Sequence, residues 1–201
     1  MSAKIYIEGS KRGENSKEMT IRCRMAFHKL LDPLCPPGRK PSLHPCGGRD
    51  RTFKDFKIAL RQNKAGFIAL LVDSEDTVED LEKPWEHLKK RDNWDRPTGV
   101  EDDQVLFMTT SMETWIAADR ETMSQHFGHR LRDATLPPPQ DLELRHRHEI
   151  LDCLERATRE CGNPYAKGKR SFEILGKLDP LVLRSLLPSF ARVERILKEQ
   201  L

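Results

Sequence analysis

AGFIALLVDSED, at residues 65–76, is the stretch of sequence that decides the fold. Residues 65–72 form an uninterrupted apolar run, which is typical of a strand in a parallel sheet whose two faces are both covered. Asp73 follows the run directly, and Glu75 and Asp76 come shortly after it. The stretch therefore predicts a buried parallel strand with acidic side chains at its carboxyl end.

A similar but shorter strand opens the chain. Lys4–Ile7 is rich in strand-forming residues, and Glu8 and Gly9 follow it. Between the two strands, Ser16–Leu31 carries apolar residues at helical spacing. The alternation of strands and helices predicts an α/β fold, in which helices flank a mostly parallel central sheet.

The remaining elements follow from the same periodicities. The prolines at 137–139 mark a linker. We therefore expect a core at residues 1–135 and a C-terminal helical extension at residues 136–201, packed together as one structural unit. Further strands are expected at Pro41–His44 and Val105–Thr110, and further helices at Thr52–Gln62, Pro84–Lys90, Glu113–Phe127, Leu144–Cys161, Ser171–Leu175, Pro180–Leu187 and Pro188–Gln200.

Composition limits the functional classes. The formal net charge of +3 neither demands nor excludes a nucleic-acid partner, and the five cysteines contain no CxxC pair. Reduced thiols are therefore favoured over a disulfide framework. The longest apolar run is too short to cross a bilayer, and residues 1–4 lead into a strand, so we expect a cytoplasmic protein without a membrane partner. The sequence lacks GxSxG, HExxH and GxGxxG motifs, which argues against serine hydrolase, zinc protease and Rossmann dinucleotide chemistry.

The acidic strand ends are the main candidates for a site. The carboxyl ends of neighbouring parallel strands meet at one edge of the sheet, where ligands of open α/β proteins bind. We therefore expect Glu8, Asp73 and Glu75 to converge, joined by Asp76 if the loop bends it inward. Carboxylate oxygens suit Mg²⁺ or Mn²⁺, so all four are candidate metal ligands. The alternative is that Glu8 is an ordinary polar strand end and that residues 73–76 form a solvated acidic loop.

Basic residues near glycines are candidates for phosphate binding. Arg49 follows a glycine turn between a strand and a helix, whereas Lys167, Lys169 and Arg170 lie in a turn that opens a helix. Helix N-termini bind phosphates through oriented amides, but the spacing here is not that of a P-loop. Both turns have a solvent-facing alternative. Glu113 is an additional candidate, although the helix dipole alone also favours an acid at that position.

Together these stretches resemble a family of small bacterial Toprim-like proteins long catalogued as a domain of unknown function. The resemblance covers nearly the whole chain and implies a Toprim-like fold. In Toprim domains a glutamate after the first strand and an Asp-x-Asp pair after a later strand hold Mg²⁺; Glu8, Asp73 and Glu75 match these positions, with Asp-x-Glu in place of Asp-x-Asp. The matching stretches are KIYIEG at 4–9, CGGR at 46–49, LVDSED at 71–76, RDNW at 91–94, DDQ at 102–104, METW at 112–115 and YAKGKRSF at 165–172.

The resemblance implies a divalent-metal-dependent nuclease or phosphodiesterase with Glu8, Asp73 and Glu75 as its catalytic residues. Several members of the family lie beside ATPases in defence-type operons, which implies a bacterial defence module with a partner ATPase. The alternative is a non-catalytic regulatory or adaptor subunit that binds such an ATPase through an exposed segment holding Trp85 and Trp94. Nucleotidyl transfer at the same metal site is a third hypothesis. The nuclease hypothesis also implies a nucleic-acid partner, either DNA or RNA.

Overall fold

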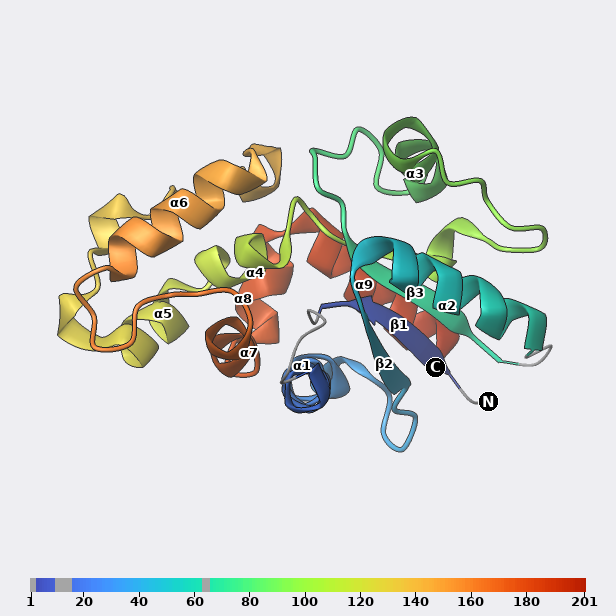
Figure 1. Cartoon of the computed structure of the whole chain (residues 1–201), viewed down its shortest axis with the longest axis horizontal. Helices are drawn as coiled ribbons and strands as arrows, with labels where there is room; N and C mark the ends of the chain where they lie inside the picture. The colour runs from blue at the N-terminus through green and yellow to red at the C-terminus, as the bar shows by residue number, and fades with distance from the viewer. Residues whose placement is uncertain (1–2, 10–15, 63–65) are drawn as a thin grey trace.

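A four-stranded parallel sheet organises the protein (Figure 1). The computed structural model describes residues 3–9, 16–62 and 66–201. The strands within these residues are β1 (Lys4–Glu8), β2 (Ser42–Gly47), β3 (Ile68–Asp73) and β4 (Val105–Met108), in the order β2-β1-β3-β4. The predicted α/β class and parallel sheet are confirmed. The first residue of the predicted central strand, Ala65, lies outside the described residues.

The strand order creates a switch point between β1 and β3. From β1 the chain passes through α1 (Ser16–Leu31) to β2 on one side, and then through α2 (Arg49–Gln62) to β3 on the other side. At such a reversal the connections leave in opposite directions, which opens a crevice beyond the carboxyl ends of the two strands. Glu8 ends β1 and Asp73 ends β3.

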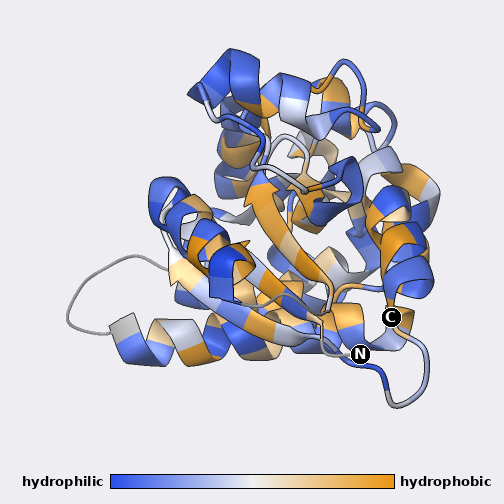
Figure 2. Ribbon diagram, turned by 90° about the vertical axis from the view of Figure 1, so that its right-hand side faces the viewer, coloured by the Kyte–Doolittle hydropathy of each residue, from blue (hydrophilic) through white to orange (hydrophobic). Residues whose placement is uncertain are grey.

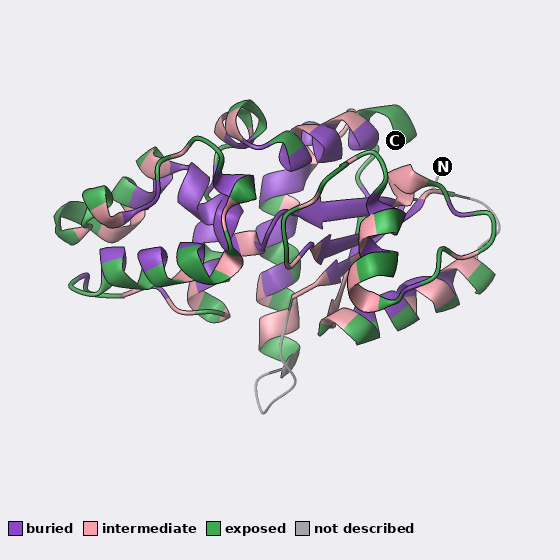
Figure 3. Cartoon of the chain, turned by 90° about the horizontal axis from the view of Figure 1, so that it is seen from above, coloured by how far each residue is buried: buried purple, intermediate pink, exposed green. Residues whose placement is uncertain are grey.

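Helices cover both faces of the sheet. Ala69 and Leu71 of β3 pack in a hydrophobic cluster with α1 and α9 (Pro188–Gln200), whereas Ile68, Leu70 and Val72 pack in a second cluster with α2 and α3 (Pro84–Asp92). This alternation follows from the two-residue period of a strand. All of these β3 side chains are buried, as the apolar run predicted. Figures 2 and 3 show hydrophobic and buried residues in the interior of the sheet, whereas the edge strand β2 is only partly buried.

The tryptophans of the polar segment 77–103 are part of the core. Trp85 and Trp94 are only 5% and 8% exposed. Trp94 stacks on Phe53 of α2, with ring centroids 4.1 Å apart. The prediction that these tryptophans form an exposed partner surface is therefore wrong. Phe53 and Phe56 of α2 supply the apolar rings against which the two tryptophans pack.

The remaining helices lie beyond the carboxyl ends of the strands (Figures 1 and 3). The predicted helix Glu113–Phe127 is interrupted at Asp119, whose carboxylate accepts hydrogen bonds from the backbone N–H groups of Thr122 and Asp179. One hydrophobic cluster includes residues on both sides of position 136. These helices are α4 (Met112–Ala118), α5 (Arg120–Phe127), α6 (Arg147–Thr158), α7 (Lys169–Leu175) and α8 (Pro180–Leu186), with 3-10 turns at Asp32–Leu34, Asp102–Gln104, Gly128–Arg130, Asp133–Thr135 and Leu142–Leu144.

Among the helices of the described residues, none combines the length and apolar character needed to cross a lipid bilayer.

A buried acid fixes α9 at its N-terminus. Glu143 is 8% exposed and accepts hydrogen bonds from the backbone N–H of Ser189, at 3.1 and 3.2 Å, and from its hydroxyl group. Burial raises the pKa of Glu143 to about 7, although the bonds from Ser189 act in the opposite direction. The folded protein therefore holds a proton at Glu143 in a pH range where the unfolded chain releases it.

We predict that the stability of the protein falls between about pH 4.5 and pH 7 because of Glu143. In this window the folded state binds more protons than the unfolded state, so the free energy of unfolding decreases as pH rises. The expected loss is on the order of 2–3 kcal/mol, and Glu143→Gln should remove it. Urea denaturation across this range measures the effect. Glu199→Gln, at an exposed position of α9, should keep the wild-type pH dependence; the same dependence in Glu143→Gln would contradict the prediction.

Candidate metal centre

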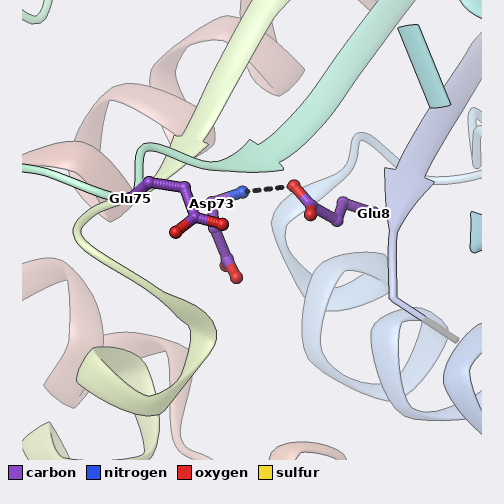
Figure 4. A group of neighbouring side chains, drawn as sticks. All are labelled: Glu8, Asp73 and Glu75. Carbon is purple, nitrogen blue, oxygen red and sulfur yellow. Dashed lines mark hydrogen bonds between the residues drawn. The ribbon is translucent and has the colours of Figure 1, made fainter. Parts of the chain in front are cut away.

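Three carboxylates meet at the switch point of the sheet (Figure 4). Glu8 ends β1, Asp73 ends β3, and Glu75 follows two residues later. One carboxylate oxygen from each lies within 4.8 Å of those from the other two. The structure thus brings together three of the four residues that the sequence analysis selected as metal ligands.

The loop after β3 reaches this arrangement differently from the expected extended strand. The strand ends at Asp73, and Glu75 adopts a left-handed backbone conformation with φ of 70°. The backbone N–H of Ser74 donates to the carbonyl of Met108, and that of Glu75 donates to the carbonyl of Thr110. The end of β4 therefore holds the loop in a turn, and the Glu75 carboxylate lies beside Asp73 (Figure 4).

Asp76 is not part of the cluster. Its side chain is 56% exposed and pairs with Arg91 of α3, at 3.1 Å. The loop brings the Glu75 carboxylate to the cluster as expected, but it leaves Asp76 at the surface. Asp76 therefore lies outside the site to which the sequence analysis assigned it.

Burial makes the carboxylate cluster electrostatically unfavourable. Burial raises the pKa of Asp73 well above its usual value, and the charges of Glu8 and Glu113 raise it further. Burial also raises the pKa of Glu8, although Arg49 opposes this. Like charges brought together at low dielectric disfavour ionisation, and a nearby cation reverses that effect. The cluster is therefore a place that favours positive charge.

Arg49 fixes the spacing of the cluster. Its side chain is 12% exposed and forms a two-pronged ion pair with Asp92, at 2.9 and 2.6 Å. The remaining nitrogen donates to Glu8 at 3.3 Å and to the backbone carbonyl of Asp73. The guanidinium also lies over the ring of Trp94, 4.9 Å from its centroid. Arg49 was expected to hold phosphate, but in the structure its donors serve the protein's own acids.

The predicted basic turn borders the cluster from the opposite end of the sequence. Lys167 lies 3.3 Å from a carboxylate oxygen of Glu113, and the hydroxyl of Tyr165 donates to the same oxygen at 2.8 Å. Glu113 is buried, so Lys167 and Tyr165 balance an otherwise isolated charge. Arg170 instead donates to the carbonyl of Pro164 at 2.6 Å and braces the turn.

A cavity of about 790 Å³ joins these groups. Its lining includes Glu8, Asp73 and Glu113 on the acidic side and Lys167 and Lys169 on the basic side. Glu75 and Arg170 are not among its lining residues. The sheet edge and the C-terminal helices thus build one cavity between them, although the two sets of residues are far apart in the sequence.

Sequence reasoning missed several residues of the site. Asp92 and Tyr165 belong to stretches that the family resemblance singled out, but neither was assigned a role. Arg91 and Arg147 both pair with Glu75 and restrain the loop after β3, Arg91 at 3.5 Å. The available signals were the matching stretches at 91–94, which contain Arg91 and Asp92, and at 165–172, which contain Tyr165, whereas Arg147 lies in neither.

The fold and the site define an α/β protein with a cluster of carboxylates at one edge of a parallel sheet. The chain belongs to the family described as "Domain of unknown function (DUF4276)", which matches residues 24–198. No curated protein and no solved structure matches the chain.

We predict that Arg49→Met destabilises the protein by about 3 kcal/mol, because it leaves the largely buried carboxylates of Glu8 and Asp92 without their partner. Arg51→Met is a matched control in the same helix, where Arg51 is 53% exposed and pairs with Asp55. Its stability should stay close to that of wild type, because an exposed ion pair contributes little. Chemical denaturation at neutral pH measures both, and equal losses would show that Arg49 is not a buried brace.

Proposed function

We propose that this chain is a divalent-metal-dependent phosphodiesterase or nuclease of Toprim type that acts on nucleic acid. The observation that carries the proposal is the convergence of Glu8, Asp73 and Glu75 at the switch point of the sheet. The expectation of Mg²⁺ or Mn²⁺ as cofactor rests on the same three residues.

The donor set fits a hard divalent cation. Such ions bind oxygen ligands at about 2.0–2.6 Å, so two ligands of one ion lie up to roughly 5 Å apart. The three carboxylate oxygens lie within 4.8 Å of one another, and partial burial beside Glu8 and Glu113 raises the pKa of Asp73 well above its usual value. A cation there would relieve the repulsion that burial imposes. Glu8, Asp73 and Glu75 are therefore the residues that would hold it.

The residues around the cluster fit phosphate chemistry. A divalent cation bound there would polarise a phosphoryl oxygen and lower the pKa of a coordinated water molecule. Glu8 has a raised pKa and is suited to hold a proton at its carboxylate. Lys167 and Lys169 line the same cavity and would bind a phosphate group by charge. Arg49, which donates to both, would hold the Glu8 carboxylate and the end of β3 at a fixed distance from each other.

The adaptor hypothesis relied on Trp85 and Trp94 as an exposed surface for a partner ATPase. Both side chains are buried, so they do not support it. A partner ATPase and a role in bacterial defence remain predictions of the family resemblance alone. Hydrolysis and nucleotidyl transfer share the same metal site, and the cavity does not separate them. We favour hydrolysis because a cation and a water molecule are the only further reactants it needs.

We predict that Asp73→Asn separates metal binding from folding. Without metal, the variant should be about 0.5–2 kcal/mol more stable than wild type, because removing a buried functional charge relieves repulsion. The amide oxygen of asparagine can still accept the 2.8 Å bond from the Met112 backbone N–H. Mn²⁺ at 100 times its dissociation constant should stabilise wild type by about 2.7 kcal/mol and leave the variant unchanged.

Calorimetric titration and thermal unfolding with Mn²⁺ or Mg²⁺ test this prediction. Asp76→Asn, three residues further on and at the surface, is the control and should bind metal as wild type does. Metal binding that persists in Asp73→Asn, or that is lost in both variants, would move the site away from the strand ends.

We also predict that Glu8→Gln lowers phosphodiester hydrolysis at least about a hundredfold, since the amide cannot take up a proton. Cleavage of DNA and RNA oligonucleotides in Mn²⁺ is the assay, and circular dichroism monitors the fold. Full activity in a folded Glu8→Gln protein would exclude the assigned role.

A further inference from the structure

The cavity beside the carboxylates is far larger than a metal ion and a phosphate group require. Its volume is about 790 Å³. A cation and one phosphate take the space of a few water molecules, each with roughly 30 Å³ of liquid volume. Cavities of several hundred cubic ångströms enclose whole small ligands. Most of this space is therefore available to another part of the substrate.

The additional space has an apolar wall. Met19, Met112 and Phe172 line the cavity together with the charged groups. Thioether and phenyl groups pack well against flat aromatic rings. A site that contacted only the phosphate backbone of a nucleic acid would be expected to have a polar, basic surface at this position.

The apolar wall adjoins both charged parts of the cavity. Met19 lies against Gly168, between Lys167 and Lys169: a Cβ atom at Gly168 would be 3.3 Å from Met19 Cε. Phe172 lies against Gly9, directly after Glu8: a Cβ atom at Gly9 would be 3.7 Å from Phe172 Cζ. A ligand that reaches this wall can therefore place its phosphate near the lysines and the carboxylates at the same time.

The charge of the cavity also favours a phosphorylated ligand. Among the described residues, Lys169 forms no ion pair, and its side chain is exposed beside the cavity. Lys167 shares its charge with Glu113. Lys169 is thus the cation whose charge is most available to a ligand phosphate.

We propose that the cavity binds one unpaired nucleotide of the substrate, with its base against Met19 and Phe172 and its phosphate near Lys169 and the carboxylates. This inference rests on the proposed function and specifies its substrate class as single-stranded or unpaired nucleic acid. Bases in a duplex are stacked within the helix and reach such a pocket only after extrusion.

Binding of small probes tests the pocket directly. We expect calorimetry on the Mn²⁺-loaded protein to show at least about tenfold tighter binding of adenosine 5′-monophosphate than of ribose 5-phosphate, because the base adds contact with the apolar wall. Met19→Ala should remove this preference and leave ribose 5-phosphate binding unchanged. Met25→Ala, in the same helix but 55% exposed and outside the cavity lining, is the matched control and should keep the preference.

A second variant guards against a loss of folding. A Cβ atom at Gly48, which lines the cavity, would have no neighbour within 4 Å, so a side chain there enters open space. Gly48→Leu should abolish adenosine 5′-monophosphate binding while Mn²⁺ binding persists. Retained nucleotide binding in this variant would place the ligand elsewhere.

Hydrolysis assays separate this inference from the proposed function. A single strand should be cleaved at least about tenfold faster than a closed hairpin duplex of the same sequence. Equal rates, with no preference for adenosine 5′-monophosphate, would overturn the nucleotide pocket and leave the hydrolase intact. A base preference without hydrolysis of any nucleic acid would retain the pocket and overturn the hydrolase.

Discussion

The buried guanidinium of Arg49 connects the elements that meet at the edge of the sheet. It engages Asp92 of α3, Glu8 of β1 and the backbone carbonyl of Asp73 in β3. An arginine fork fixes direction as well as charge, because its N–H groups lie in one plane. The pairing with Asp92 therefore orients the nitrogen that faces Glu8, and the two strand ends keep a set distance. The carboxylate cluster depends on that distance.

Much of the fold could be predicted because its signals are local. The apolar run of β3 is buried on both faces, and Glu8 and Asp73 follow from where the strands end. The edge strand was less well predicted: it runs from Ser42 to Gly47, beyond the expected end at His44. Pro45 lies inside it, and a proline is tolerated only where one side of the strand needs no partner. The order β2-β1-β3-β4 provides that condition, but the local sequence does not reveal the order.

The rest of the site could not be predicted because its contacts are long-range. Arg49 forms an ion pair with Asp92, which lies 43 residues away in the sequence. Tyr165 donates a hydrogen bond to Glu113, which lies 52 residues away. Neither pairing has a periodicity or motif that would indicate it. The tryptophans show the same limit: their exposure was inferred from polar neighbours in the sequence, yet burial was decided by apolar rings on α2. Local pattern thus identified the acids of the site, and only the tertiary fold showed what holds and balances them.

The three carboxylates do not contribute equally to attracting a cation. Glu75 already pairs with Arg91 of α3 and with Arg147 of α6, so at the proposed site a metal ion would compete with two arginines for it. Asp73 accepts one backbone hydrogen bond, from Met112, and Lys167 lowers its pKa, but no arginine or lysine is directly paired with it among the described residues, and desolvation, Glu8 and Glu113 outweigh these two effects. Because the gain from a cation is largest where compensation is least, Asp73 should contribute most to binding. In the proposed site, Glu75 would then link metal binding to the position of the loop after β3, since any bond from Glu75 to a metal would weaken its ion pairs with the two arginines.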